Sequence, residues 1–152
     1  VIRSVKRPVK EVDYGFVGDV QRVDASVLCH LLGQGAVPVM APLTHDGAGH
    51  MLNTNADTIA GETALALASH FDVTLVYCFE KKGVLMDEND DDSVIPVITP
   101  ELFRQYVQQG IIGGGMIPKL ENALAAVAGG VEKVIITAAE ELGRGGGTVI
   151  KK

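Results

Sequence analysis

The fold class of this chain follows from a strongly apolar run, Val73-Thr74-Leu75-Val76-Tyr77-Cys78-Phe79. Its β-branched and aromatic residues predict a strand, and the lack of polar alternation is typical of a strand covered on both faces. An Ala-rich segment that ends near His70 precedes the run, and an acidic segment from Asp87 follows it. We therefore expect a central strand of a sheet that helices flank.

Strands and helices are expected to alternate on both sides of this run. On the N-terminal side we expect strands at 14–23, 37–41 and 51–54, a helix from the cap Asp24 to about 32, a hairpin tip at 45–50, and a helix from Asn53 or Asn55 to about 70. On the C-terminal side we expect helices after the cap Thr99 and over 116–128, and strands at 131–137 and 148–151. This alternation predicts an α/β fold with a mainly parallel sheet sandwiched by helices, in one domain over 1–152.

The composition limits the classes of function. With 152 residues, 47% hydrophobic and 21% charged, the chain is large and apolar enough for one globular core. The net charge of -6 argues against a nucleic-acid or anionic-membrane surface. No apolar run approaches the roughly 20 residues of a membrane span. Because Cys29 and Cys78 form no motif and no signal peptide is evident, we expect a cytoplasmic protein.

The segment with the most chemistry is Gly113-Gly114-Gly115-Met116-Ile117-Pro118-Lys119. Its glycines let the backbone approach a ligand, and the helix that follows directs its positive dipole end toward the same place. Lys119 falls in the first turn of that helix, within reach of the same anion. The segment is not a Walker A loop, because proline precedes the lysine and no Ser or Thr follows it. It indicates a phosphate site; the alternative is a flexible turn with a solvated lysine.

Two further polar segments sit at strand ends. Asn53-Thr54-Asn55-Ala56-Asp57 places two amides and a carboxylate where a strand gives way to a helix, although helix capping explains at least one of the three. The segment from Glu80 to Leu85 follows the central strand, where ligands of α/β sheets bind, and its alternative is a polar turn.

Several weaker patterns do not predict a site. The acidic segment 87–92 has oxygen ligands at alternate positions, but it lacks the glycine and the final glutamate of a calcium loop. His45 and His50 have no thiolate or helical histidine partner, so zinc is not expected. We predict no metal ligands among the side chains of this chain.

Taken together, the polar and glycine-rich segments resemble the acetylglutamate kinase family, a branch of the amino acid kinase family, across nearly the whole chain. The matching strings are 14–20 (YGFVGDV), 37–42 (VPVMAP), 53–57 (NTNAD), 82–85 (KGVL) and 114–119 (GGMIPK). The last string is quite specific within the broader family when it is combined with Asn-x-Asn-Ala-Asp. The resemblance thus covers both the strand ends and the glycine-rich turn.

The resemblance implies an enzyme of arginine biosynthesis that transfers a phosphoryl group from ATP, with Mg²⁺, to the side-chain carboxylate of N-acetyl-L-glutamate. Lys119 would stabilise the phosphoryl group in flight, Asp57 would hold the catalytic lysines, and Asn53 would contact the acylated amino acid. The adenine and ribose would lie against residues of two segments, namely Phe79, Glu80, Gly83, Val84, Leu85, Ile111, Gly114, Gly115 and Met116. A homo-oligomer is expected for the intact enzyme.

The chain also departs from the family pattern. The family usually has Ser/Thr-Asp after the central strand, where this chain has Phe79-Glu80. Family members begin with a strand, a lysine, a glycine-rich phosphate loop and a substrate-binding arginine, and none of these is found before Val1. We therefore expect the C-terminal, nucleotide-binding portion of the kinase, which alone would bind ATP weakly and turn over nothing. The alternatives are a non-catalytic nucleotide-binding or regulatory module and a kinase for N-succinyl-L-glutamate.

Overall fold

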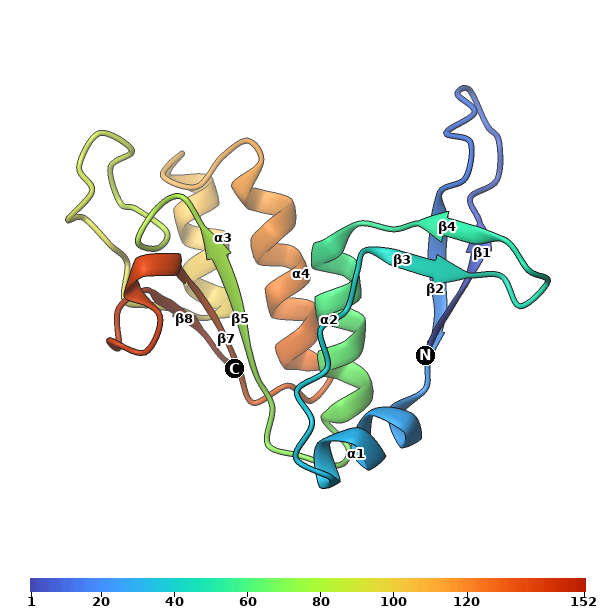
Figure 1. Cartoon of the computed structure of the whole chain (residues 1–152). Helices are drawn as coiled ribbons and strands as arrows, with labels where there is room; N and C mark the ends of the chain where they lie inside the picture. The colour runs from blue at the N-terminus through green and yellow to red at the C-terminus, as the bar shows by residue number, and fades with distance from the viewer. The chain divides into compact units, whose positions relative to one another are not determined.

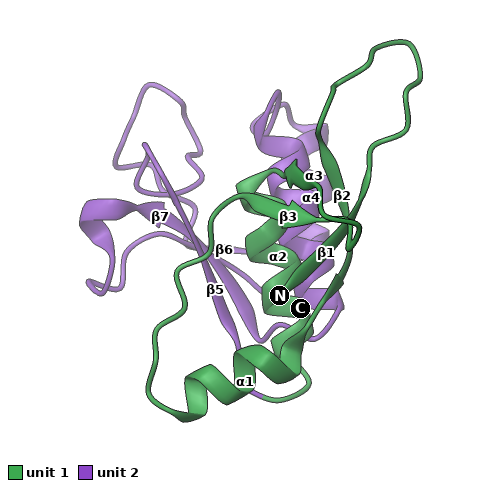
Figure 2. Cartoon of the chain, turned by 45° about the vertical axis from the view of Figure 1, so that its right-hand side comes forward, with its two compact units in different colours: residues 1–70 green, residues 71–152 purple.

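The structure is a computed structural model that describes residues 1–152, and the chain forms two compact units. Unit 1 comprises Val1–His70 and unit 2 comprises Phe71–Lys152 (Figures 1 and 2). Each unit has its own four-stranded sheet and its own pair of α-helices. The α/β class predicted from the alternating pattern is confirmed.

Unit 1 is built on a mixed sheet with the strand order β2-β1-β3-β4. Its strands are β1 (Ile2–Lys6), β2 (Gly18–Val23), β3 (Leu43–His45) and β4 (Met51–Asn53). β1 pairs antiparallel with β2 and parallel with β3, and β3 and β4 form the antiparallel hairpin that was predicted around 45–50.

The helices of unit 1 begin at the caps expected from the sequence. The Asp24 side chain accepts from the Val27 N–H at the start of α1 (Ala25–Gly33), and Asn55 accepts from Thr58 at the start of α2 (Ala56–Leu67). α2 packs against β2 and α1. The buried apolar side chains of the unit come from both helices and from the sheet: Ile2, Leu28, Leu52, Ile59 and Ala64.

Unit 2 is built on a second mixed sheet, with the order β5-β7-β8-β6. Its strands are β5 (Thr74–Phe79), β6 (Val97–Ile98), β7 (Lys133–Ala138) and β8 (Thr148–Ile150). β5 runs parallel to β7, β6 runs parallel to β8, and β7 and β8 are antiparallel. Its helices are α3 (Pro100–Gln108), α4 (Met116–Ala128) and the short 3₁₀ turn η1 (Ala139–Glu141).

The core of unit 2 lies between its sheet and α4. Leu120, Ala123 and Val127 recur at helical spacing and are buried, so α4 presents one apolar stripe to β7 and β8. On β7, the side chains of Val134 and Ile136 are also buried. α3, capped by Thr99 as predicted, packs against α4 and β6.

Two expectations about the strands are wrong, and one strand was not expected. Residues 37–41 form no strand, because Pro38 and Pro42 lack the N–H that a ladder needs, and Val37 and Val39 lie exposed. The strand expected over 14–23 begins only at Gly18. β1 was not expected at all, since two of its five residues are cationic and its burial rests on Ile2 and Ser4.

The apolar run 73–79 also differs from its prediction in one respect. It forms β5 as expected, but β5 is an edge strand of the unit 2 sheet rather than a central one. Leu75 and Tyr77 are buried while Thr74 and Cys78 are exposed, so the strand is covered on one face. None of the helices has the length and apolar character that crossing a bilayer requires.

Candidate active site

A cavity of about 260 Å³ opens between two loops of unit 2. One wall is the loop after β5, with Gly83, Val84 and Leu85, and the other is the segment between α3 and α4, with Ile111 and Met116. All five residues were predicted to contact the nucleotide. The lining also contains Lys81, Ile112 and Gly113, which lie within the two predicted segments, and Glu88, which was not predicted. The cavity is thus mainly apolar, with one cation and one carboxylate on its walls.

The loop after β5 is held by close backbone contacts. A Cβ at Gly83 would lie 2.8 Å from both Thr148 Oγ1 and Val94 Cγ1, so only glycine fits without movement. The Val84 N–H donates to the Thr148 hydroxyl at 2.8 Å, and the Val84 carbonyl accepts from the Ile95 N–H at 2.8 Å. Both backbone groups of buried Val84 are therefore satisfied, and the loop is fixed to the start of β8.

The opposite wall is set by the end of α3 and the start of α4. The Ile111 and Ile112 N–H groups both donate to the Tyr106 carbonyl, which turns the chain back after α3. At the α4 start no side chain caps the helix and its first turn holds no acidic residue. Space is open at Gly113, Gly114 and Gly115, where an added Cβ would meet nothing within 4 Å. No side chain compensates the positive end of this helix, although the Met116 and Ile117 N–H groups donate to the Gly113 and Gly114 carbonyls, and the turn before it is open, which suits an anion.

Lys119 lies in the first turn of α4 and is half-buried. Its ammonium Nζ stands over the Phe79 ring, 3.7 Å from the ring centroid. Phe79 ends β5, so the lysine lies at the carboxyl end of that strand. The alternative of a solvated lysine does not describe this side chain, because an aromatic face covers one side of its charge.

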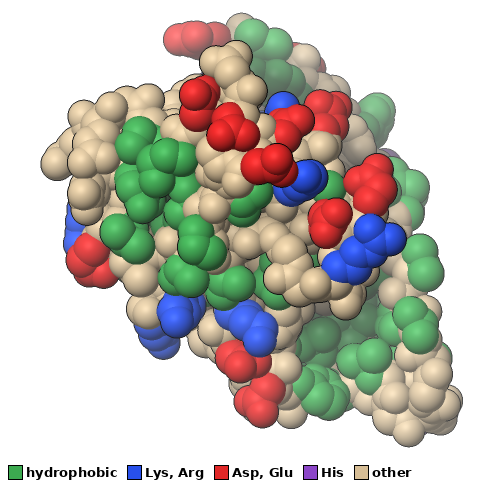
Figure 3. Space-filling view, turned by 90° about the vertical axis from the view of Figure 1, so that its left-hand side faces the viewer, with side chains coloured by type: hydrophobic (Ala, Val, Ile, Leu, Met, Phe, Trp, Pro, Cys, Tyr) green, Lys and Arg blue, Asp and Glu red, His purple; other side chains and the backbone are tan.

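Charged side chains join the loop after β5 to the acidic loop. Lys81 pairs with Asp91 at 2.6 Å, and Lys82 pairs with Asp92 at 3.0 Å. The hydrogen bond from Lys81 lowers the pKa of the Asp91 carboxyl and the hydrogen bond to Asp91 raises the pKa of Lys81. The face drawn in Figure 3 accordingly carries acidic side chains with basic ones between them. A second cavity, of about 290 Å³, lies here and includes Glu80.

Within the acidic loop the carboxylates bind the chain's own backbone. Asp87 accepts from the Asn89 N–H at 2.9 Å, and Asp90 accepts from the Asp92 N–H at 3.0 Å. Ser93 closes the loop by donating to the Asp87 and Asp90 carbonyls. These turns give the loop a defined shape without a bound ion.

Asn53, Asn55 and Asp57 all lie in unit 1, where β4 gives way to α2. Asn55 is the residue that caps α2, as the capping alternative predicted for one of the three. Asn53 ends β4 with an exposed side chain, and its backbone N–H donates to the Phe16 carbonyl at 2.7 Å. Asp57 is half-buried in the first turn of α2. Asn55 therefore serves as the helix cap, and the predicted functional roles concern Asn53 and Asp57.

Four of the residues predicted to contact the nucleotide do not line the 260 Å³ cavity: Phe79, Glu80, Gly114 and Gly115. Gly114 and Gly115 stand next to the 260 Å³ cavity in the chain but are not part of its lining. Phe79 faces Lys119, and Glu80 lines the neighbouring 290 Å³ cavity. Glu88 is the lining residue that the sequence reasoning missed, because it lies in the acidic segment 87–92, which was interpreted as a solvated loop.

Comparison with protein families identifies the chain's relatives. The family model described as "Amino acid kinase family" matches residues 2–138. The chain belongs to the amino acid kinase family. This membership agrees with the resemblance carried by the glycine-rich turn and the Asn-x-Asn-Ala-Asp string.

Among curated members of this family, the chain is 75% identical to an acetylglutamate kinase of Phocaeicola vulgatus and 72% identical to one of Bacteroides thetaiotaomicron, each over 152 residues. In both comparisons the alignment covers 100% of this chain and 59% of the relative. The chain thus spans somewhat more than half the length of these curated relatives.

Solved structures show the same amino acid kinase architecture. The structure of smu.665 from Streptococcus mutans matches with a TM-score of 0.76 and 33% identity, covering 99% of this chain and 56% of that one. N-acetylglutamate synthase from Neisseria gonorrhoeae, solved with coenzyme A and L-arginine, matches with a TM-score of 0.81 and 23% identity over 99% of this chain and 36% of that one. Carbamate kinase from Giardia lamblia bound to AMP-PNP has a TM-score of 0.64 at 16% identity, covering 100% of this chain and 60% of that one. The last two show the fold alone.

Proposed function

We propose that this chain is the nucleotide-binding portion of an ATP-dependent kinase that phosphorylates the side-chain carboxylate of N-acetyl-L-glutamate, in arginine biosynthesis. The observation that carries the proposal is the placement of the apolar cavity, the open glycine turn and Lys119 along one end of unit 2. The substrate is suggested by the curated relatives, which are named acetylglutamate kinase. We also expect a cytoplasmic homo-oligomer.

The cavity suits the adenine end of a nucleotide. Its volume of about 260 Å³ is below the roughly 300–1,000 Å³ of sites that enclose a whole drug-sized ligand, so it accommodates a base rather than an entire nucleotide. Val84 and Leu85 provide apolar surface from one loop, and Ile111 and Met116 provide it from the other. A flat heterocycle between these walls would remove apolar surface from water on both of its faces.

The phosphates then follow the glycine turn toward Lys119. The helix end at Gly115 supplies partial positive charge, and the absence of side chains at Gly113, Gly114 and Gly115 lets phosphate oxygens approach the backbone. Lys119 lies in the first turn of α4, so its ammonium adds a full positive charge close to this helix end. We assign Lys119 to the transferred phosphoryl group.

The reaction needs no general base. A glutamate carboxylate has a pKa near ~4.3 and is already ionised at neutral pH. One of its oxygens attacks the γ-phosphorus of ATP, the bond from that phosphorus to the bridging oxygen breaks, and ADP leaves with the bonding electrons. The products are an acyl phosphate and ADP. The protein contributes alignment and charge, so Lys119 stabilises the equatorial oxygens of the phosphoryl group in flight.

Mg²⁺ is proposed as the partner of the phosphates. It keeps several waters and commonly takes only one or two carboxylates in addition to substrate phosphates. Unit 2 has no cluster of three or more metal-ligating side chains, and Glu88, the carboxylate on the cavity wall, lies at the place assigned to the base rather than to the phosphates. When bound, Mg²⁺ would neutralise charge on the β- and γ-phosphates. The residues present fit a metal that the nucleotide carries.

The roles of two residues in unit 1 rest on the family resemblance. Asp57, in the first turn of α2, is proposed to orient the catalytic lysines by charge and hydrogen bonding. Asn53, at the end of β4, is proposed to contact the acylated amino acid. An Asn53→Ala variant should accordingly raise the KM for the acyl amino acid and leave the KM for ATP near the wild-type value.

The decisive experiment uses the full-length protein with ATP, Mg²⁺ and N-acetyl-L-glutamate, and traps the acyl phosphate with hydroxylamine. We expect acyl hydroxamate and ADP in equal amounts. A parallel assay with N-succinyl-L-glutamate distinguishes the two acyl groups. Binding of ATP without hydroxamate from either substrate would contradict the proposal and favour a non-catalytic nucleotide-binding module.

A further inference from the structure

The contact between Lys119 and Phe79 joins two segments that lie far apart in the sequence. Phe79 is the last residue of β5, and Lys119 lies in the first turn of α4. The separation of 3.7 Å between Nζ and the ring centroid is well inside the ~6 Å limit for a cation–π interaction. The ring face is therefore occupied by the ammonium, and Phe79 does not line the 260 Å³ cavity assigned to the base.

The charges around Lys119 explain why its ammonium needs the Phe79 ring. The positive end of the α4 dipole repels a cation in the first turn, and no acidic residue of that turn offsets it. The ion pairs of unit 2 use other cations: Lys81, Lys82, Arg104 and Arg144. The negative face of the Phe79 ring opposes this repulsion and keeps the ammonium at the carboxyl end of β5.

The Phe79 ring is itself held in place. Phe79 pairs with Ala138 in the parallel ladder between β5 and β7. Two residues earlier on the same face, buried Tyr77 stacks on it, with ring centroids 6.0 Å apart and an interplanar angle of 20°. A fixed ring restricts the lysine more effectively than a mobile one, because lysine loses a large rotamer entropy when it is ordered.

We propose that Phe79 is a positioning residue for Lys119: its ring holds the ammonium in advance at the place where the phosphoryl group is transferred. This inference rests on the proposed kinase function, which it extends by moving Phe79 from the nucleotide wall to the support of the catalytic lysine. One side of the ammonium faces the ring, and its N–H donors on the other side stay available to phosphate oxygens. The lysine then requires less ordering during the reaction.

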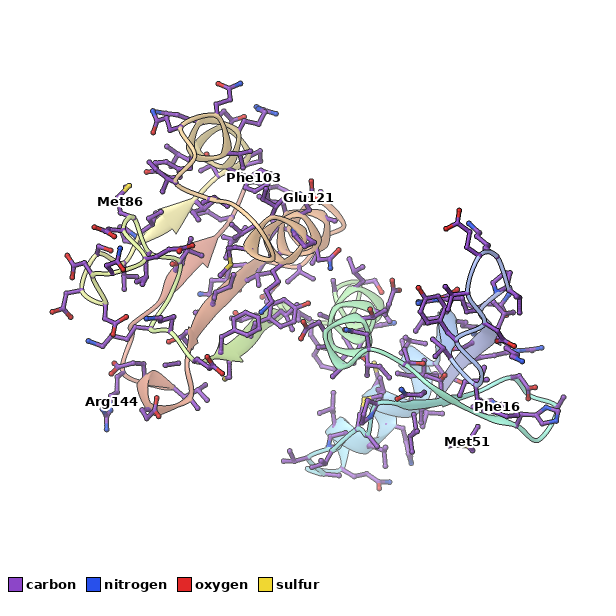
Figure 4. The ribbon with its side chains drawn as sticks, turned by 90° about the horizontal axis from the view of Figure 1, so that it is seen from above. Phe16, Met51, Met86, Phe103, Glu121 and Arg144 are labelled. Atoms are coloured by element: carbon purple, nitrogen blue, oxygen red, sulfur yellow. The ribbon has the colours of Figure 1, made fainter.

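The test compares three variants of the full-length protein. Phe79→Leu keeps an apolar side chain and removes the π face, and Phe79→Tyr keeps the π face. Phe103→Leu is the matched control, since Phe103 is an aromatic residue of α3 in the same unit (Figure 4), while the cation–π contact of Lys119 is with Phe79. Lysines are ¹³C-dimethylated, which preserves their charge, and Lys119→Arg assigns the Lys119 resonance by removing it.

We expect the Lys119 methyl resonance to lie upfield of the other lysines in wild type, Phe79→Tyr and Phe103→Leu, and to lose that ring-current shift in Phe79→Leu. In steady-state kinetics, Phe79→Leu should lower kcat about tenfold and leave the KM for ATP within about twofold, as the size of a cation–π contact suggests. Phe79→Tyr should restore kcat.

Two results would overturn the inference: a Lys119 resonance that Phe79→Leu leaves in place, or a Phe79→Leu enzyme with the wild-type kcat. An inactive wild-type protein would instead contradict the proposed function. The NMR comparison needs no turnover, so the two failures are distinguishable.

Discussion

The Thr148 hydroxyl accepts a hydrogen bond from the backbone N–H of Val84 at 2.8 Å, and this bond ties the first residue of β8 to the cavity wall. Both residues are buried, so water cannot replace either partner. A side chain from the last strand thereby sets the position of a loop that follows β5, far earlier in the chain. The cavity depends on the unit 2 sheet through this bond as well as through its own loops.

Replacing Thr148 by Val should destabilise the protein by about 1–3 kcal/mol, because the Val84 N–H would stay buried without an acceptor. Thr148→Ser, which keeps the hydroxyl, is the control and should retain most of the stability. Urea unfolding measures the free energy of unfolding for both variants, and ATP titration reports whether the loop still forms the cavity wall. Equal stability of wild type and Thr148→Val would show that the bond has no net effect.

Gly83→Ala should also destabilise the protein, by about 1–3 kcal/mol, because the new Cβ would lie 2.8 Å from Thr148 Oγ1 and from Val94 Cγ1. Gly113→Ala provides the matched control in the same unit, since a Cβ there meets nothing within 4 Å. Urea midpoints should therefore fall for the first variant only. Parallel losses in both would show that the contacts of the new Cβ with Thr148 and Val94 are not the cause, because the entropy of the unfolded chain alone makes Gly→Ala stabilising.

The features predicted best are those whose cause is local. The caps Asp24, Asn55 and Thr99 were predicted because a short polar side chain satisfies an N–H three residues later in the same segment. The start of α4 at Met116 was also predicted, since the glycines before it interrupt regular structure. Such signals need no knowledge of the rest of the fold.

Features that depend on distant partners were not predictable. β1 carries Arg3 and Lys6 and becomes a strand only because β2 and β3 supply its hydrogen bonds. The position of β5 at the edge of a sheet follows from the pairing of all four strands of unit 2, which no single segment encodes. The Phe79 ring was predicted to contact the nucleotide, and its contact with Lys119 requires the packing of α4 on the sheet.

Lys119→Met should lower kcat by about 10²–10³ or more, the usual cost of removing one charge from a phosphoryl-transfer or oxyanion site. The free energy of unfolding should change little, because position 119 is half-buried and a methionine side chain there can keep an apolar contact with Phe79. Lys133→Met is the control. Lys133 is the first residue of β7 and Ala138, the ladder partner of Phe79, is the last, so Lys133 lies at the far end of the strand from the site. Steady-state kinetics of the full-length variants measure the effect. A Lys119→Met enzyme with normal kcat would remove Lys119 from the catalytic step.

The hairpin between β3 and β4 should make the stability of unit 1 depend on acidic pH through Asp46. The Ala48 N–H at 2.7 Å, together with the His50 side chain, lowers the pKa of the Asp46 carboxyl to about 2. A depressed pKa means that the folded state favours the carboxylate, so its stabilisation is present above the unfolded value of ~3.9 and is lost as the pH falls toward 2.

Asp46→Asn tests this dependence. Urea midpoints of wild type and Asp46→Asn should differ by a constant amount above about pH 4, and the difference should shrink between pH 4 and 2. His50→Ala should keep most of the pH dependence of the wild type, because the Ala48 N–H is the largest cause of the shift and the His50 side chain comes second. If the difference between wild type and Asp46→Asn instead persists unchanged down to pH 2, the contribution of Asp46 is steric rather than ionic. The shape of the hairpin would then depend on the turn at Gly47 and Gly49, which have positive φ angles, and not on the charge of the Asp46 carboxylate.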